Sequence, residues 1–365
     1  MKARCTVEKI KQAVSLAERM TGKNLTLPSL HGLLINASGK SLKIRATNLN
    51  VGIEIDIPAT IEEEGIVLVK GDLLSNVCGN LKDNLELSLT LEADNLTIAT
   101  LQSKTVLKCL NHDDFPTLPT VEGESFEIKS TVFQEGIRSV YFSAAITEIK
   151  PEIASIFIYS EDTNLCFVAT DSFRLAEKKL KVKNIPDIPK ILIPYKNIAD
   201  ILKVLDNAPE NLQLTFTRNQ LSLSGNGIYF TTRLIDGAFP QYQLIIPKTE
   251  TTKVVLMKQE LISTLRLSTI FADKFFQVLF SVSPVNKRIT IDSKNNDVGS
   301  SVSSIDAVVE GEGIEVSFNL KYFLDVFQAL SGDSVSISFT APNKPIVVRS
   351  VQDTSFLYLI MPTNR

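Results

Sequence analysis

Three stretches of alternating polar and apolar residues decide the fold of this chain: ELSLTLEADNLTIAT at residues 86–100, NLQLTFTRNQLSLSG at 211–225 and SVSISFTAPNKPIVVRS at 334–350. A period of two puts the apolar side chains on one face of a strand, so each stretch predicts half-buried strands. Each stretch breaks at an Asn, a residue that tolerates the left-handed conformation many hairpin turns require. Asn95, Asn219 and Asn343 are evenly spaced, 124 positions apart. This spacing predicts an internal repeat.

A helix is predicted just before each stretch, because apolar residues recur there at i, i+3, i+4 and i+7. The three copies of this stripe are Leu74, Val77, Cys78 and Leu81; Ile198, Ile201, Leu202 and Leu205; and Phe323, Val326, Phe327 and Leu330. A second, earlier helix repeats as well. Its copies are Ile10, Val14 and Ala17, then Phe133, Ile137 and Val140, then Leu261 and Leu265, displaced by a few residues.

Two further features keep the same period. The segment ATNLNVGIEIDI, from residue 46, recurs as ATDSFRLAEKKL from residue 169, and Phe115-Pro116 is answered by Phe239-Pro240 and then by Met361-Pro362. Three unrelated domains of equal length would not share turn, helix and Pro positions. The fold class is therefore predicted to be α+β, with three tandem copies of one unit that places two helices on an antiparallel sheet. Their limits are predicted at residues 1–121, 122–248 and 249–365.

Composition is that of an ordinary soluble protein, with 44% hydrophobic and 22% charged residues. No apolar run approaches the ~20 residues that span a bilayer, and no apolar segment follows the basic start MKARCTVEKIKQAV, so we expect a cytoplasmic protein with no membrane partner. Cys5, Cys78, Cys109 and Cys166 form no Cys-x-x-Cys pair, which argues against zinc and against a disulfide scaffold. The net charge of −3 implies that any DNA binding is local or weak.

Catalysis is not expected. The chain has only two His residues, His31 and His112, and it contains no Gly-rich phosphate loop, no metal-spaced cluster and no nucleophile elbow. We therefore expect no enzyme activity, no metal and no cofactor.

The tracts ATDSFRLA, DGAFPQYQLIIP and the chain end YLIMPTNR resemble the bacterial sliding clamp family, the beta subunits of DNA polymerase III. The usual forms in the family are close to ATDGHRLA, DGRFPDYRRVIP and YLIMPMRL. This chain departs from them at Ser172-Phe173, at Gln241 and Gln243, and in its tail, Thr363-Asn364-Arg365. The resemblance covers the whole chain, and the altered tail leaves the choice of partners open.

The resemblance implies a head-to-tail homodimer that closes a ring around duplex DNA without reading its sequence. Twelve helices at ~9–10 Å spacing would surround a hole roughly 26 Å across, wide enough for a duplex. It also implies partners: the catalytic subunit of DNA polymerase III, the clamp loader, and other polymerases and repair proteins with clamp-binding motifs. A tandem-repeat scaffold that binds proteins without encircling DNA remains the alternative.

The resemblance further implies a pocket for Gln-x-x-Leu-Phe-like peptides between the second and third units. The matched positions combine aliphatic walls, an adaptable Met and a few polar groups. They are Ile153, Thr170, Ser172, Phe173, Arg174, Leu175, Pro240, Leu244, Ile245, Leu359, Met361, Pro362, Thr363, Asn364 and Arg365. Two alternatives stay open: Asp171 and Arg174 can form a structural turn with a local ion pair, and Leu359 and Met361 can belong to an ordinary core strand.

Phosphate contacts are expected at Lys23, Asn24, Lys70 and Lys196, although each Lys can equally be solvated surface. By resemblance, Ile270 and Phe271 lie at the dimer junction, where an edge strand of one chain pairs with the other. The alternative for these two residues is core packing at the end of a helix.

Overall fold

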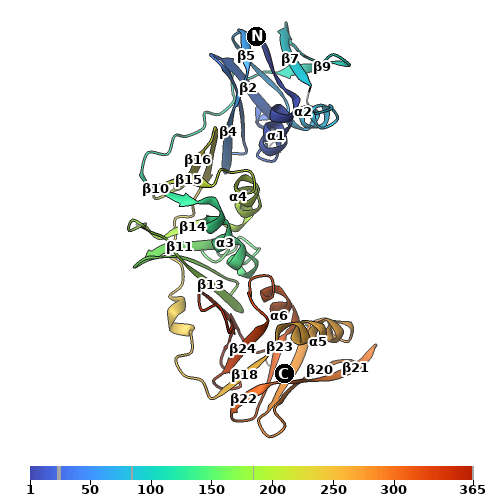
Figure 1. Cartoon of the computed structure of the whole chain (residues 1–365), viewed down its shortest axis with the longest axis vertical. Helices are drawn as coiled ribbons and strands as arrows, with labels where there is room; N and C mark the ends of the chain where they lie inside the picture. Colours follow the sequence, from blue (N-terminus) through green and yellow to red (C-terminus); the bar gives the residue numbers. More distant parts are fainter. Residues whose placement is uncertain (23–25, 84, 184, 364–365) are drawn as a thin grey trace. The chain divides into compact units, whose positions relative to one another are not determined.

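The computed structural model describes residues 1–22, 26–83, 85–183 and 185–363 (Figure 1). Its contacts divide the chain into two compact bodies. The first body comprises Met1–Gln134 and Lys196–Leu234, and the second comprises Glu135–Tyr195 and Ile235–Arg365. Each body contains residues of the predicted second repeat, so the limits proposed for the three repeats remain a prediction.

The first body is built on one large sheet, in which neighbouring strands are antiparallel. Its order is β10 (Glu124–Lys129), β15 (Asn211–Phe216), β16 (Gln220–Gly225), β17 (Ile228–Arg233), β4 (Val51–Pro58), β3 (Ser41–Thr47), β2 (Gly32–Ser38), β6 (Gly65–Lys70), β9 (Lys104–Leu110), β8 (Asn95–Ala99), β7 (Glu86–Glu92), β1 (Lys2–Thr6) and β5 (Thr60–Glu63). Helices α1 (Val7–Glu18) and α2 (Gly71–Gly79) pack together, and α4 (Ile198–Leu205) and the short η1 (Pro28–His31) complete this body.

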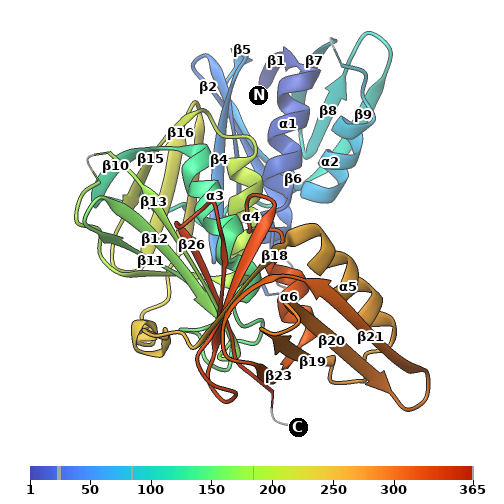
Figure 2. The same ribbon diagram turned by 60° about the horizontal axis from the view of Figure 1, so that its bottom comes forward.

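The second body contains two sheets. The larger one has the order β14 (Ile191–Pro194), β11 (Ser155–Glu161), β12 (Asn164–Thr170), β13 (Arg174–Lys181), β26 (Phe356–Ile360), β25 (Ile346–Ser350), β24 (Ser334–Phe339), β18 (Thr252–Met257) and β22 (Val308–Gly311). The smaller one has the order β21 (Gly299–Asp306), β20 (Arg288–Asn295), β19 (Gln277–Ser283) and β23 (Ile314–Asn319). Figure 2 shows α5 (Lys258–Ile270) lying along β20 and β21, with α6 (Leu320–Val326) beside it.

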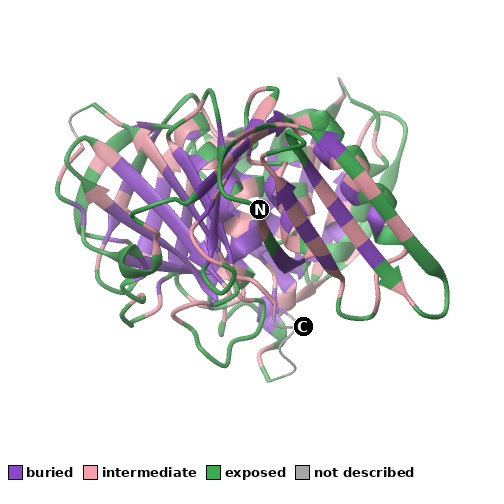
Figure 3. Cartoon of the chain, turned by 90° about the horizontal axis from the view of Figure 1, so that it is seen from below, coloured by how far each residue is buried: buried purple, intermediate pink, exposed green. Residues whose placement is uncertain are grey.

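The predicted helices are confirmed within the described residues, with α3 at Ser130–Val140 as the sixth. The short helix η2 (Tyr141–Ser143) directly follows α3, and the short helix η3 (Tyr195–Asn197) directly precedes α4. The stripes are buried as expected at Ile10, Phe133 and Leu261. However, α2 and α6 end before the last apolar residue predicted for each, Leu81 and Leu330. Along β7, β8, β15 and β24, buried residues alternate with less buried ones, a pattern visible as stripes on strands in Figure 3, which confirms the period of two there. In the same three stretches, β16 and β25 are more continuously buried.

The prediction of left-handed Asn residues at the hairpin turns is wrong. In the first hairpin the left-handed residue is Ala93, with φ of +50°, while Asn95 begins β8. Neither Asn219 nor Asn343 has a positive φ. The side chain of Asn219 instead accepts a hydrogen bond from the Thr217 hydroxyl, at 3.1 Å. Asn219 therefore contributes to the turn through its side chain and not through a left-handed backbone.

The sequence repeat at residues 46 and 169 is confirmed as a repeated turn. Leu49 in the β3–β4 turn has φ of +73°, and Ser172 in the β12–β13 turn, 123 positions later, has φ of +77°. In both turns the preceding Asx side chain accepts hydrogen bonds from two backbone amides: Asn48 from residues 50 and 51, and Asp171 from residues 173 and 174. One local sequence pattern thus builds the same turn twice.

All four cysteines are free thiols; Cys5, Cys78 and Cys166 are buried and Cys109 is partly buried. Burial raises the pKa of Cys78 and Cys166 to about 11, so these thiols stay protonated near neutral pH. No helix in the described ranges is long and apolar enough to cross a membrane.

Candidate functional site

The β12–β13 turn presents one apolar side chain to solvent. The Thr170 hydroxyl donates to the Arg174 carbonyl at 2.6 Å and accepts from the Ser172 amide at 3.1 Å, which locks the turn. Ser172 has a positive φ, a backbone conformation that favours Gly. The result is that the Phe173 side chain is 60% exposed while the backbone beneath it is rigid.

Arg174 is a partly buried cation enclosed by acids and an aromatic ring. Its Nε lies 2.9 Å from the Asp171 carboxylate, its Nη1 donates to Asp325 of α6, and its guanidinium carbon lies 4.7 Å from the centre of the Tyr322 ring. Burial opposes the charge, but Tyr358, Asp325 and Asp171 together outweigh it and raise the pKa of Arg174 above its usual value. Arg174 is therefore charged at all ordinary pH values.

The chain end runs alongside this turn. β13 pairs with β26, so that Arg174 lies opposite Ile360 and Leu175 opposite Leu359. The Met361 amide then donates to the Phe173 carbonyl at 2.8 Å, which fixes the partly buried Met361 next to the exposed ring-bearing residue. Further on, the Thr363 amide donates to the Ser317 carbonyl of β23 at 2.8 Å.

A connector, residues 235–248, covers part of one face of the nine-stranded sheet. Phe239 stacks on Phe157 with ring centres 4.8 Å apart, and Tyr242 lies edge-on to Phe239 at 6.2 Å. The short helix η4 (Tyr242–Ile245) begins at this buried Tyr and leaves Leu244 77% exposed and Ile245 50% exposed. The aromatic contacts thus hold a short apolar ridge in place at the surface.

Buried polar groups fasten the connector. The Tyr242 hydroxyl lies 2.7 Å from that of Tyr159 and also donates to the carboxylate of Glu177, which is only 8% exposed. Burial raises the pKa of Tyr159 to about 12, and burial together with Glu177 raises that of Tyr242 further. Both phenols therefore stay protonated and can keep these hydrogen bonds.

The predicted docking residues fall into three groups. Exposed or partly exposed side chains are Ser172, Phe173, Arg174, Pro240, Leu244, Ile245, Met361, Pro362 and Thr363, with Ile153 on the loop before β11. Thr170, Leu175 and Leu359 are buried, at 7%, 1% and 2% exposure. Asn364 and Arg365 lie outside the described residues.

The first structural alternative raised by the sequence is observed, and the second is observed for Leu359 but not for Met361, which follows the end of β26 and is partly buried. Asp171 and Arg174 form the expected turn with an ion pair, and Leu359 belongs to the core together with Leu175 and Tyr242. Leu175 and Leu359 belong to the buried cluster against which Phe239 and Ile246 of the connector pack.

Sequence reasoning missed residues at this site. They are Tyr322 and Asp325, which hold Arg174. Arg174 and Asp325 are 151 residues apart, and no local pattern indicates such a pair.

The expected DNA-facing and dimer residues are less completely described. Lys70 and Lys196 are exposed, at the N-terminal ends of α2 and α4, whereas Lys23 and Asn24 lie outside the described residues. Ile270, at the end of α5, is 62% exposed, so the alternative of core packing is wrong for it. Phe271 is partly buried and lies 3.6 Å from the position a Cβ would take at Gly299.

Three family models cover nearly the entire chain. They are the N-terminal, central and C-terminal domains of the DNA polymerase III beta subunit, at residues 1–119, 127–241 and 243–364. The beta sliding clamp of Bacillus subtilis is 26% identical over 99% of both chains, and that of Synechococcus elongatus is 24% identical, again over 99% of both.

Solved structures agree with this assignment. The DNA polymerase III beta subunit of Thermotoga maritima superposes with a TM-score of 0.94 at 26% identity, covering 100% of this chain and 99% of that one. The Bacillus subtilis sliding clamp gives the same TM-score, identity and coverage. The chain therefore belongs to the DNA polymerase III beta subunit family, the sliding clamps, which act as processivity factors in DNA replication and not as enzymes.

Proposed function

We propose that two copies of this chain close head to tail into a ring around duplex DNA. The observation that carries this proposal is a pair of free strand edges. β21 is the longest strand at the end of any sheet, and β9 pairs with β6 only at Cys109 and Leu110, which leaves residues 104–108 without a neighbour on that side among the described strands. Such edges readily pair with a strand of another chain.

Apolar surface adjoins each edge. Beside β9, a hollow of about 550 Å³ is lined by Leu73, Val77, Leu81 and Leu85, together with Thr105 of the strand itself. Val302 of β21 is 66% exposed, and Ile270, at the end of helix α5 that packs on β20 and β21, is 62% exposed. An apolar patch beside a free edge is what a dimer junction needs, since strand pairing alone aligns two chains but burial of apolar area stabilises them.

We further propose that the surface formed by Phe173, Leu244, Ile245 and Met361 takes hydrophobic peptide motifs of its partners. These would be the catalytic subunit of DNA polymerase III, the clamp loader, other polymerases and repair proteins. An aromatic or Leu anchor suits the exposed aliphatic side chains, and the fixed turn below them reduces the entropy cost of binding. Thr170, Leu175 and Leu359 would form the floor, and Ile153, Pro240, Pro362, Thr363, Asn364 and Arg365 the margin.

DNA contacts are proposed at Lys70 and Lys196, with Lys23 and Asn24. They would be made to phosphates and would carry no sequence information. A closed ring stays on DNA by topology, so weak contacts suffice and agree with a net charge of −3. Because the chromosome of a bacterium is not enclosed by a membrane, we propose a cytoplasmic location.

The decisive test is loading of labelled protein by a clamp loader onto nicked circular DNA. Gel filtration follows before and after a restriction enzyme cuts the circle. We expect co-elution with the circle and loss of the protein from the linear product. Equal behaviour on both, or no retention on either, would instead support a protein-only scaffold.

A matched pair of variants tests whether the β21 edge forms the dimer junction. Val302→Lys places a charge on the edge strand β21. Val285→Lys places a charge in the β19–β20 hairpin of the same sheet, at a residue that is 92% exposed. We expect only Val302→Lys to shift the protein toward monomer in sedimentation velocity. If both variants behave like the parent, β21 does not form the junction.

A further inference from the structure

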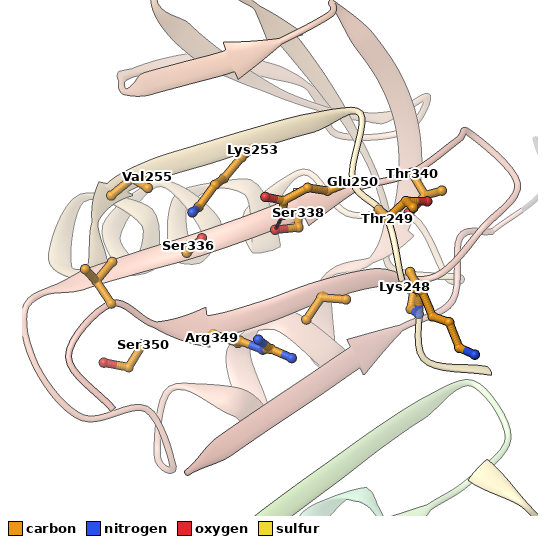
Figure 4. Close-up of a pocket in the computed structure, with 13 residues that line it drawn as sticks. Lys248, Thr249, Glu250, Lys253, Val255, Ser336, Ser338, Thr340, Arg349 and Ser350 are labelled. Atoms are coloured by element: carbon orange, nitrogen blue, oxygen red, sulfur yellow. Dashed lines mark hydrogen bonds between the residues drawn. The ribbon is translucent and has the colours of Figure 1, made fainter. Parts of the chain in front are cut away.

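The face of the nine-stranded sheet that the connector partly covers also carries a hollow. Beyond β25 the connector no longer covers this face, and a hollow of about 550 Å³ lies over β18, β24 and β25 (Figure 4). Its lining is Pro247, Lys248, Thr249, Glu250, Lys253, Val255, Ser336, Ser338, Thr340, Val347, Arg349, Ser350 and Val351. We call this hollow the trough.

Strand register explains how the trough is built. Successive side chains of a strand point to opposite faces, so Lys253 and Val255 share a face, as do Ser336 and Ser338. In the pairing, Lys253 lies opposite Ser338, and Ser336 lies opposite Arg349. A floor of short hydroxyl side chains on β24 therefore has a cation on each side, and the short floor is what makes the surface hollow.

The trough has an excess of positive charge. Lys248, Lys253 and Arg349 form no ion pair with any described residue, and the only carboxylate in the lining, that of Glu250, accepts a hydrogen bond from Ser338. Figure 4 shows this bond and the three cationic side chains around it. The lining has three cations and one carboxylate, and Glu310 of β22 lies opposite Lys253 at the margin, so the local charge is about +1 on a chain whose net charge is −3.

We propose that the trough binds an acidic, extended peptide segment of a partner protein, at a site separate from the hydrophobic docking surface. Charge complementarity identifies the ligand as an anion. Its size argues for a chain, since the hollow is far larger than a single phosphate or carboxylate. The hydroxyls of Ser336, Ser338 and Thr340 can bond to peptide amides and carbonyls, which extends the match beyond charge.

The lining disfavours nucleic acid as the ligand. Single-stranded nucleic acid binds to surfaces that combine cations with aromatic rings on which bases stack. The lining of the trough contains no aromatic residue. An acidic peptide needs no such ring, because its carboxylates and main chain meet the cations and hydroxyls directly.

Strand spacing sets a preferred spacing for the acidic residues. Lys253 and Arg349 are two strands apart and offset by two residues, which separates their backbones by ~12 Å. An extended peptide advances ~3.3 Å per residue, so carboxylates three or four positions apart would reach both cations. Peptides with a single acidic residue should bind more weakly.

The test is a titration of fluorescein-labelled peptides, followed by anisotropy, against the full chain at low salt. The probe is a Glu, Ser and Gly peptide with Glu at every third position; the comparisons are its Gln counterpart and an oligothymidylate of equal charge. We expect the Glu peptide alone to bind well, with an affinity that falls as salt is added. No binding of the Glu peptide, or tighter binding of the oligothymidylate, would overturn the proposal.

Variants locate the binding. Lys253→Glu combined with Arg349→Glu should weaken the Glu peptide about tenfold or more, whereas Lys190→Glu, on an exposed loop of the same body, should change it less than twofold. Binding of a Gln-x-x-Leu-Phe peptide should be unaffected, so that failure of the trough and failure of the proposed docking surface are distinguishable. Equal weakening by Lys190→Glu would show a general charge effect and overturn the site.

The unaltered protein provides a second measurement if the double variant does not fold. A Glu peptide carrying a photo-reactive group is cross-linked to the chain, and the attachment points are mapped by mass spectrometry. We expect attachment within residues 247–255 and 336–351. Attachment spread over other basic surfaces would contradict the proposal.

Discussion

The β3–β4 turn and the β12–β13 turn share one backbone but differ in the surface they carry. Each holds a residue at positive φ, and each is followed by a strand that pairs with the next part of the chain: β4 with β17 and β13 with β26. One backbone hydrogen bond is repeated as well. The Arg233 amide donates to the Asn50 carbonyl in the first turn, and the Met361 amide donates to the Phe173 carbonyl in the second.

Only the second turn presents an exposed aromatic ring, that of Phe173, which we propose as part of the docking surface. Asn50 in the first turn corresponds to Phe173 in the second, and Val51, which is 2% exposed, corresponds to Arg174. The repeated backbone therefore supplies a similar junction twice, whereas side chains at a few positions distinguish the second junction as the proposed binding site.

The largest effect should come from removing the cation that distinguishes the second turn. Arg174→Met leaves Asp171 and Asp325 without their partner, and breaking a largely buried pair costs about 3 kcal/mol of unfolding free energy. Arg45→Met is the control, because Arg45 pairs with Glu54 at a more exposed site, where the loss should be below about 1 kcal/mol. Urea denaturation measures both. Equal losses would show that Arg174 is no more than a surface charge.

Lowering the pH should destabilise the β13–β26 junction more than the β4–β17 junction. Lys178 in β13 is 5% exposed and lies 3.0 Å from both Glu135 and Asp353, whereas the corresponding residue of β4 is Ile55. Although burial opposes its charge, hydrogen bonds from Ser355 and Lys178 lower the pKa of Asp353 to about 2.

A lowered carboxyl pKa gives stability that is complete above the unfolded pKa of ~3.9 and lost as the pH falls toward 2. The contribution of Asp353 at neutral pH is about 2 kcal/mol, so Asp353→Asn should destabilise the protein by about that amount at pH 7 and progressively less below pH 4. Asp306→Asn, at a 92% exposed side chain, is the control. A pH-independent effect of Asp353→Asn would contradict the assignment.

A smaller and opposite effect is expected at the shared positive-φ position. Ser172→Gly and Leu49→Gly each relieve a strained left-handed residue, at the cost of a more flexible unfolded chain, for a net gain of ~0.5–1 kcal/mol. Thermal unfolding should show similar gains at both turns. A gain at only one turn would mean that side-chain contacts, and not the common backbone, set the strain.

The smallest effect on stability should accompany a large effect on binding. Phe173→Ala removes a 60% exposed ring and should change the unfolding free energy by less than about 0.5 kcal/mol. It should nevertheless weaken a Gln-x-x-Leu-Phe peptide at least tenfold in a fluorescence titration, because exposed aromatic anchors dominate such interfaces. Asn50→Ala, at the corresponding exposed position of the first turn, should alter neither quantity. Unchanged binding in Phe173→Ala would remove this residue from the site.

Local patterns predicted much of this molecule. The helices at Ile10, Phe133 and Leu261, and the repeated turns at residues 49 and 172, follow from period and turn chemistry over a few residues. Asn95 shows the limit of such reasoning, because the neighbouring Ala93 took the left-handed conformation instead. The ends of α2 and α6 likewise depended on more than the apolar stripe.

By itself the sequence determined the repeat, the α+β class and the family, since these rest on periodicity and on motifs carried by contiguous residues. Only the tertiary structure decided which charges meet and which stay free. Arg174 reaches Asp325 across 151 positions and Tyr242 reaches Glu177 across 65. Lys253 and Arg349 instead lie on either side of β24, and neither forms an ion pair within the described part of the chain. Pairings of this kind depend on strand order and register, which no single stretch of the chain encodes, because they arise when distant strands share one sheet.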